Sequence, residues 1–114
     1  MNVLVTGSEG FIAKNLIIEL KHLNYNIIKF NKKNTPNHLE EKIIKSDIIF
    51  HLGGENRSDN KKNFFKNNVK FSKQISDIII KNRLKKKIIF SSSTQVISNK
   101  DSIYGKTKLL AEKE

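Results

Sequence analysis

Apolar residues fall into short unbroken runs that alternate with longer stretches in which they recur every three or four positions. The unbroken runs predict buried strands, and the recurring positions predict amphipathic helices. We expect strands at 2–6, 26–30, 47–52 and 87–93, and helices over 11–23, 36–45, 60–82 and from about residue 104 onward. This alternation predicts an α/β fold, a doubly wound parallel sheet with helices on both faces. Strands that are apolar throughout are typical of a sheet buried on both sides.

The helical spacing also predicts which side chains face the interior. The expected inward positions are Ile12, Leu16, Leu20 and Leu23 in the first helix, Leu39, Ile43 and Ile44 in the second, and Phe64, Val69, Phe71, Ile75, Ile78 and Ile79 in the long helix. The three histidines show no metal-ligand spacing, so we expect no metal site. His51, inside the third strand, is expected to be a packed or hydrogen-bonded core residue.

The chain of 114 residues is long enough for one domain with a real core, so we treat 1–114 as a single domain. The last helical pattern runs to Glu114 without a glycine cap or a proline, and we expect the front part of a longer protein. The absence of cysteine excludes disulfides and thiolate chemistry. The first strand begins at Asn2, and no apolar run approaches a membrane span, so we expect a cytoplasmic protein without a membrane partner.

The formal net charge of +11 raises nucleic-acid binding as a possible function. Of the 22 basic residues, however, only Arg57 and Arg83 are arginine, the residue that nucleic-acid readers favour for bidentate contacts. The lysines are spread along the whole chain rather than clustered. We therefore expect no nucleic-acid partner.

The stretch VTGSEGFIAKNL, residues 3–14, joins the first strand to the first helix through a glycine turn. Gly7 permits a tight turn, Gly10 leaves room for a ligand near the backbone, and Ala13 lets the helix pack close to the strand. Because the open N–H groups of a helix N-terminus favour anions, the stretch predicts a diphosphate or dinucleotide site. The alternative is a plain structural turn.

The spacing G-x-x-G-x-x-A, with TG before it and FI inside it, resembles the extended short-chain dehydrogenase/reductase superfamily, the nucleotide-sugar epimerases, dehydratases and reductases. Three further stretches match that superfamily in order: DIIFHLGG (47–54), FSSSTQV (90–96) and YGKTK (104–108). The resemblance implies a Rossmann-type domain whose C-terminal substrate region is absent from this chain. The cofactor contacts that it implies are Gly7, Gly10, Phe11, Ile12, Asn31, Lys32, Leu52, Gly53, Gly54, Asn67, Tyr104 and Lys108.

The pair Tyr104 and Lys108 resembles the superfamily's catalytic Tyr-x-x-x-Lys. Tyr25 and Lys29 have the same spacing, but on a strand four residues span roughly 13 Å, whereas at a helix start they are neighbours. The resemblance implies that Tyr104 exchanges a proton with the sugar and that Lys108 stabilises the phenolate and holds the nicotinamide ribose. It also implies that Ser93 orients the reacting oxygen. The alternative for Ser93 is a serine in a polar strand end that caps the next element. The alternative for Tyr104 is a half-buried aromatic residue at a helix start.

The second strand ends in Phe30-Asn31-Lys32-Lys33, where NAD-preferring relatives place an aspartate. The lysines favour NADP, with NAD as the alternative. The compact layout resembles the capsular-polysaccharide reductases, which act on a 4-keto nucleotide-amino-sugar. We expect an NAD(P)-dependent reductase, epimerase or dehydratase of surface polysaccharide biosynthesis, a homodimer at full length. The alternative is a non-catalytic dinucleotide-binding or redox-sensing module.

Overall fold

The computed structural model describes residues 1–31, 33–34, 36–54, 61–92, 97 and 102–114. Its strands are β1 (Asn2–Thr6), β2 (Asn26–Phe30), β3 (Ile48–His51) and β4 (Lys87–Phe90). They form one parallel sheet in the order β2-β1-β3-β4. The helices are α1 (Phe11–His22), α2 (Pro36–Lys45), α3 (Lys61–Phe65), the π-helical segment η1 (Lys66–Lys70), α4 (Phe71–Lys81) and α6 (Ile103–Glu112).

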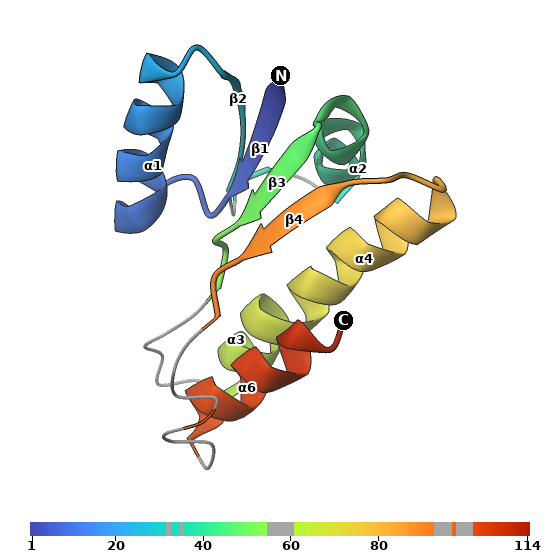
Figure 1. Ribbon diagram of the computed structural model, residues 1–114. Helices are drawn as coiled ribbons and strands as arrows, with labels where there is room; N and C mark the ends of the chain where they lie inside the picture. Colours follow the sequence, from blue (N-terminus) through green and yellow to red (C-terminus); the bar gives the residue numbers. More distant parts are fainter. Residues whose placement is uncertain (32, 35, 55–60, 93–96, 98–101) are drawn as a thin grey trace.

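Helices cover both faces of the sheet, as the sequence predicts. Figure 1 shows α1 on one side of the strands and α2 and α4 on the other. Because successive strand residues point to opposite faces, β1 contributes to two cores. Val3 and Val5 pack with Ala13, Ile17 and Leu20 of α1. The second core lies beneath α2 and α4 and contains Leu4, Phe30, Leu39, Ile43, Ile49 and Ile75.

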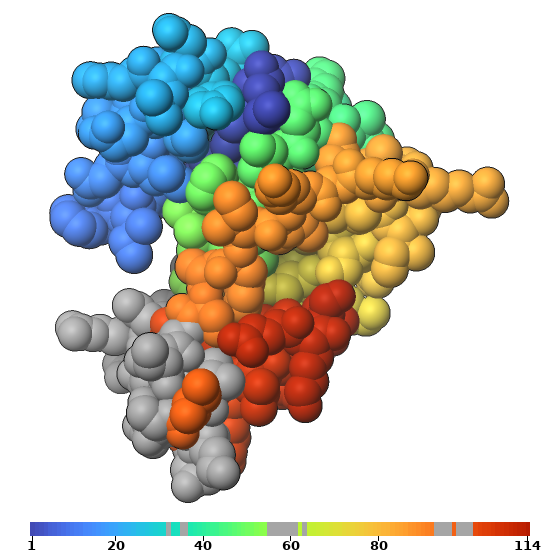
Figure 2. Space-filling view, in the orientation of Figure 1, coloured from blue at the N-terminus to red at the C-terminus, as the bar shows by residue number. Residues whose placement is uncertain are grey.

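The order of the strands in the sheet indicates where a ligand would bind. With β2 on one side of β1 and β3 on the other, the order of the strands reverses at β1. In open α/β sheets, ligands bind outside the carboxyl ends of the strands at such a reversal. Helix α6 lies beside α3 and η1, below that end of the sheet. In the space-filling view, the segment around β4 separates α1 from α6 (Figure 2).

Three inward assignments are wrong. Ile12 and Leu23 are 68% and 67% exposed, because α1 turns the stripe of Ala13, Ile17 and Leu20 toward the sheet. Leu20 is buried and Leu16 packs partly buried against the same core, so these two assignments are confirmed. Ile44 is 46% exposed, since α2 buries Leu39 and Ile43, one turn apart, and leaves the next residue outside.

Strand and helix boundaries also differ from the expectation. β3 and β4 are shorter than 47–52 and 87–93, and the long helix contains the π-helical turn η1. Ile88 and Ile89 of β4 are exposed, because in the described part of the chain β4 pairs with β3 alone. No described helix is long and apolar enough to cross a membrane.

Candidate functional site

The turn after β1 leads directly into α1. Gly7 has a φ of +65°, a left-handed conformation that glycine adopts without strain, and its carbonyl accepts the Gly10 N–H at 2.9 Å. Gly10 is the N-cap of α1, and within the described chain no side chain caps that end. The N–H groups of the first helical turn, beginning with Phe11 and Ile12, have no partners within the helix. Open N–H groups at a helix N-terminus favour anions, so the geometry of this end suits the diphosphate site that the sequence predicts.

Gly7 also touches the loop after β3. A Cβ atom at Gly7 would lie 2.8 Å from the Cα and N atoms of Gly53, closer than real Cβ contacts. The Gly53 N–H donates to Thr6 Oγ1 at 3.0 Å. The two glycine loops, far apart in sequence, are therefore in direct backbone contact at the reversal of the strand order.

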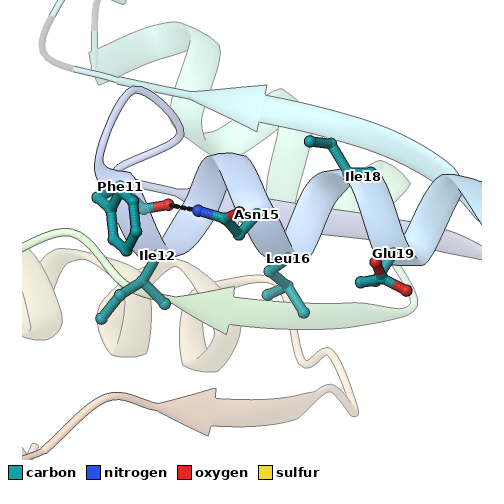
Figure 3. Close-up of a pocket in the computed structure, with 6 residues that line it drawn as sticks. All are labelled: Phe11, Ile12, Asn15, Leu16, Ile18 and Glu19. Atoms are coloured by element: carbon teal, nitrogen blue, oxygen red, sulfur yellow. Dashed lines mark hydrogen bonds between the residues drawn. The ribbon is translucent and has the colours of Figure 1, made fainter.

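The side chains at the start of α1 leave this region open to solvent. Phe11 and Ile12 are exposed, and Ala13 is buried against the sheet. A shallow hollow of about 380 Å³ runs along α1, and Figure 3 shows that Phe11 and Ile12 line it at its N-terminal end. The other residues of this hollow are Asn15, Leu16, Ile18 and Glu19. Its apolar start thus adjoins the uncapped N-terminus of the helix.

Lys108 is a buried cation. It is only 4% exposed, and its Nζ donates to the Ser91 carbonyl at 2.9 Å. Nζ lies 5.0 Å from the ring centroid of Phe90 and 5.9 Å from that of Tyr104. Burial lowers the pKa of Lys108. Among the described residues no carboxylate forms an ion pair with it. Such an ammonium has donors left for a ligand.

Tyr104 stands one turn before Lys108 on α6, as the spacing predicts. Its half-buried ring meets the edge of Phe64, with centroids 6.4 Å apart. Ser102 caps the helix by accepting the Gly105 N–H at 2.9 Å. The structure therefore brings the tyrosine and the lysine together at a helix start, with the ammonium facing the ring.

The glycines after β3 approach this pair. A Cβ atom at Gly54 would lie 2.7 Å from Asn68 Oδ1 and 2.8 Å from Lys108 Nζ. Asn68 is fully buried in η1, and its Nδ2 donates to Thr107 Oγ1 at 2.9 Å. The family resemblance implies the neighbouring Asn67, whereas Asn68 has no counterpart among the predicted site residues. The asparagine doublet is visible in the sequence, but which member turns inward depends on the π-helical turn.

The second strand ends in a compact turn. The Asn31 N–H donates to Asn34 Oδ1, and Asn31 Oδ1 accepts the Lys33 N–H, both at 2.9 Å. The side chain of Asn31 therefore closes its own turn. Lys32 and Ser93, two further predicted site residues, lie outside the described residues.

His51 is a hydrogen-bonded core residue, as expected. It is 3% exposed, with Nδ1 2.8 Å from Thr6 Oγ1 and Nε2 2.8 Å from Ser72 Oγ. Burial, with a smaller contribution from the charge of Lys108, lowers its pKa to about 4. Among the described residues there is no group of three or more histidines and carboxylates that could hold a metal ion.

These residues fit a dinucleotide. The first loop offers uncapped helical N–H groups and Ser8, whose buried Oγ has no hydrogen-bond partner within the described chain. The second loop offers bare backbone at Gly53 and Gly54. Beside it stands Lys108, which can donate to ribose hydroxyls. The donor set suits an anionic ligand with hydroxyl groups.

Comparisons with known proteins agree with this assembly. The model of the NAD dependent epimerase/dehydratase family matches residues 3–113. A UDP-2-acetamido-2,6-beta-L-arabino-hexul-4-ose reductase from Pseudomonas aeruginosa is 31% identical over 98% of this chain and 30% of its own length.

Solved structures show the same fold. The capsular polysaccharide assembling protein CapF from Staphylococcus aureus is 35% identical, with a TM-score of 0.79, over 99% of this chain and 30% of that protein. A short-chain dehydrogenase/reductase superfamily protein from Agrobacterium tumefaciens with bound NAD has a TM-score of 0.86 at 21% identity, over 99% of this chain and 43% of that protein. At 21% identity, the similarity to the Agrobacterium protein supports the fold alone. The chain spans less than half the length of each of these relatives.

Proposed function

The chain belongs to the NAD-dependent epimerase/dehydratase family, and from this membership we propose that it forms the cofactor-binding part of an NAD(P)-dependent oxidoreductase acting on a nucleotide-linked sugar. One observation carries the proposal. The glycine loops and the Tyr104–Lys108 pair converge at the same end of the sheet, with Gly54 against the Lys108 ammonium. A module that only binds a dinucleotide has no need of a phenol and a buried ammonium on one helix turn.

In the proposed reaction, the 4-keto group of the sugar is reduced to a hydroxyl. A dinucleotide held by the glycine loops would supply the hydride for the carbonyl carbon. Tyr104 gives its phenolic proton to the carbonyl oxygen. The Lys108 ammonium stabilises the phenolate that remains and donates to the ribose hydroxyls of the cofactor. Ser93 is proposed to orient the reacting oxygen.

The proposed substrate class is a UDP-linked 4-keto amino sugar, and the proposed role is surface polysaccharide biosynthesis. Support comes from the likeness to the Pseudomonas aeruginosa reductase and to CapF. Epimerisation or dehydration of a nucleotide sugar is the alternative within the family. The proposal also includes a homodimer for the complete enzyme and a cytoplasmic location.

For the cofactor we propose NADP. The second strand ends at Phe30 and is followed by Asn31 and two lysines, so no carboxylate repels a 2′-phosphate there. The family is described as NAD dependent, and the Agrobacterium protein binds NAD. NAD is therefore the alternative cofactor, and a titration with NADH tests it.

The test is a fluorescence titration of the chain with NADPH and with NADH. We expect Gly10→Val to weaken binding at least about tenfold, because the side chain would stand at the N-terminus of α1. Lys21→Ala, at the opposite end of α1, is the control and should bind as the unchanged chain does. Failure of the unchanged chain to bind either dinucleotide would overturn the proposal. Equal binding by Gly10→Val would show that the first loop is not the diphosphate site.

A further inference from the structure

A row of buried polar groups crosses the molecule beneath the glycine loops. His51 lies at its centre, 2.8 Å from Thr6 Oγ1 through Nδ1 and 2.8 Å from Ser72 Oγ through Nε2. Gly53 N–H reaches Thr6 Oγ1 at 3.0 Å, and Ser72 Oγ reaches the Asn68 carbonyl at 3.2 Å. The proposed chemistry uses none of these side chains directly.

One assignment of the protons satisfies every hydrogen bond in this row. The Asn68 carbonyl can only accept, so Ser72 donates its hydroxyl proton to that carbonyl. Ser72 Oγ must then accept the hydrogen bond from His51 Nε2–H. Nδ1 of the same neutral ring is then an acceptor and takes the hydroxyl proton of Thr6. Thr6 Oγ1 in turn accepts the Gly53 N–H. Every hydrogen bond runs in the same direction, from the loop after β3 to η1.

Both ends of the row reach the candidate site. Gly53 belongs to the loop whose backbone contacts Gly7. At the other end, Asn68 lies against Gly54 and donates to Thr107, the residue before Lys108. The row therefore connects the two glycine loops with the helix that carries the tyrosine and lysine.

The surroundings of the imidazole keep it neutral. Phe71 of α4 meets the ring nearly at right angles, with centroids 5.0 Å apart, and Phe90 of β4 lies 5.4 Å away. The charged group that lowers the pKa of His51 is the Lys108 ammonium of α6, whose Nζ lies 5.0 Å from the Phe90 ring centroid. Thr6 of β1 and Ser72 of α4 are uncharged. Burial and a nearby positive charge both lower the pKa of His51, to about 4.

We infer that His51 is a positioning residue that couples the glycine loops to the Lys108 helix through Thr6 on one side and Ser72 and Asn68 on the other. The inference rests on the proposed function for its consequence, which is that the coupling holds Lys108 in register with the cofactor. It assigns His51 no proton transfer to substrate. A protonated His51 would donate from both nitrogens, and Thr6 would then lose its acceptor.

The first test is nitrogen-15 NMR of the His51 ring in the chain. We expect the Nε2–H tautomer from pH 5 to 8. Thr6→Ser keeps the hydroxyl and should keep this tautomer, whereas Thr6→Val is of similar size, removes the hydroxyl and should produce a mixture. An Nδ1–H tautomer or a mixture in the unchanged chain would overturn the inference, whether or not any variant folds.

The second test measures the coupling itself. Ser72→Ala should shift the amide resonances of both Gly53 and Lys108 and weaken dinucleotide binding about tenfold, the effect of one lost buried hydrogen bond. The control is Ser76→Ala, one turn further along α4, where the hydroxyl bonds the Glu114 carbonyl. It should leave both resonances and the affinity unchanged.

The outcomes separate the two proposals. Binding by Ser72→Ala that equals that of the unchanged chain, or shifts confined to one end of the row, overturns the inference. If the unchanged chain binds no dinucleotide but shows the Nε2–H tautomer and shifts at both ends, the proposed function fails. The coupling between the loops and α6 then stands.

Discussion

The two halves of the candidate site differ in the groups that they offer and in how many segments of the chain supply them. The first, the glycine loop at Gly7–Gly10, is nearly contiguous in sequence, and its binding groups are main-chain N–H groups at an uncapped helix end. The second, the Lys108 cluster, is assembled from side chains and backbone of four separate segments: Gly54, Asn68, Ser91, and α6 with Tyr104 and Lys108.

This difference separates binding from chemistry. A backbone site depends on φ and ψ angles and tolerates few side chains, so its substitution strains the fold. A side-chain cluster holds a buried charge that costs stability, so its substitution changes chemistry more than folding. Variants of the glycine loop should therefore lose stability, whereas variants of the Lys108 cluster should lose chemistry and keep the fold.

The largest effect is expected for Tyr104→Phe in the complete enzyme. The phenol is proposed to transfer a proton, and loss of such a group costs about 10³-fold in kcat. Dinucleotide affinity should stay within about twofold, because the ring remains over Lys108. Steady-state kinetics and a cofactor titration measure the two quantities. Retention of most of the turnover would remove Tyr104 from the mechanism and favour a non-catalytic module.

Gly7→Val should cost about 3–4 kcal/mol in the free energy of unfolding. A β-branched residue is strained at a φ of +65°, and its Cβ would press on the Gly53 backbone at 2.8 Å. Urea denaturation of the chain provides the measurement. Gly10→Ala is the matched control, since its Cβ would meet only the Gly7 carbonyl at 3.2 Å. Comparable losses in both variants would contradict the close contact between the loops.

The free energy of unfolding should fall as the pH is lowered from about 6.5 toward 4. The pKa of His51 is about 4 when folded and about 6.5 when unfolded, so in this range the unfolded chain binds a proton that the folded chain does not. The full interval corresponds to about 3 kcal/mol. Urea denaturation at several pH values gives the slope.

His51→Gln supplies the control for that slope, because it cannot titrate. Glu40 and Glu41 also lose stabilising contacts in acid, since hydrogen bonds from Asn82 and Lys45 respectively lower their carboxyl pKa values. Their effect is common to both proteins and cancels in the difference. An equal slope with and without His51 would mean that the imidazole is not held neutral in the fold.

The smallest expected effect has the opposite sign. Lys108→Met should raise the free energy of unfolding by about 1 kcal/mol, because it replaces an ammonium without a carboxylate partner in the described structure by an apolar side chain. Dinucleotide binding should weaken at the same time. Thermal unfolding and the NADPH titration are the measurements, with the exposed Lys106→Met as control. A clear loss of stability would show that the cluster is structural.

Local patterns in the sequence account for most of the fold. Short-range spacing predicted every described strand and the main helices, because burial imposes its period directly on each segment. The same spacing misplaced Ile12, Leu23 and Ile44, since the rotation of a helix about its axis depends on the surface that it meets. The position of η1 inside the long helix has no local signal of comparable strength.

The residues of the candidate site also divide into those that local sequence predicts and those that depend on tertiary contacts. Gly7 and the Tyr104–Lys108 spacing are legible in sequence, because turns and helix neighbours are local. Asn68 and the Ser91 carbonyl were missed, since both enter the site through contacts with a residue from another segment.

The sequence by itself determined the order of strands and helices, the glycine turn and a tyrosine and lysine able to share a helix face. Only the tertiary structure decided that Gly7 must pack on Gly53, that Lys108 is buried against Ser91, and that His51 joins Thr6 to Ser72. The physical reason is range. Backbone conformation and amphipathic period act over a few residues, whereas burial of a charge or an imidazole depends on groups that only the folded sheet brings together.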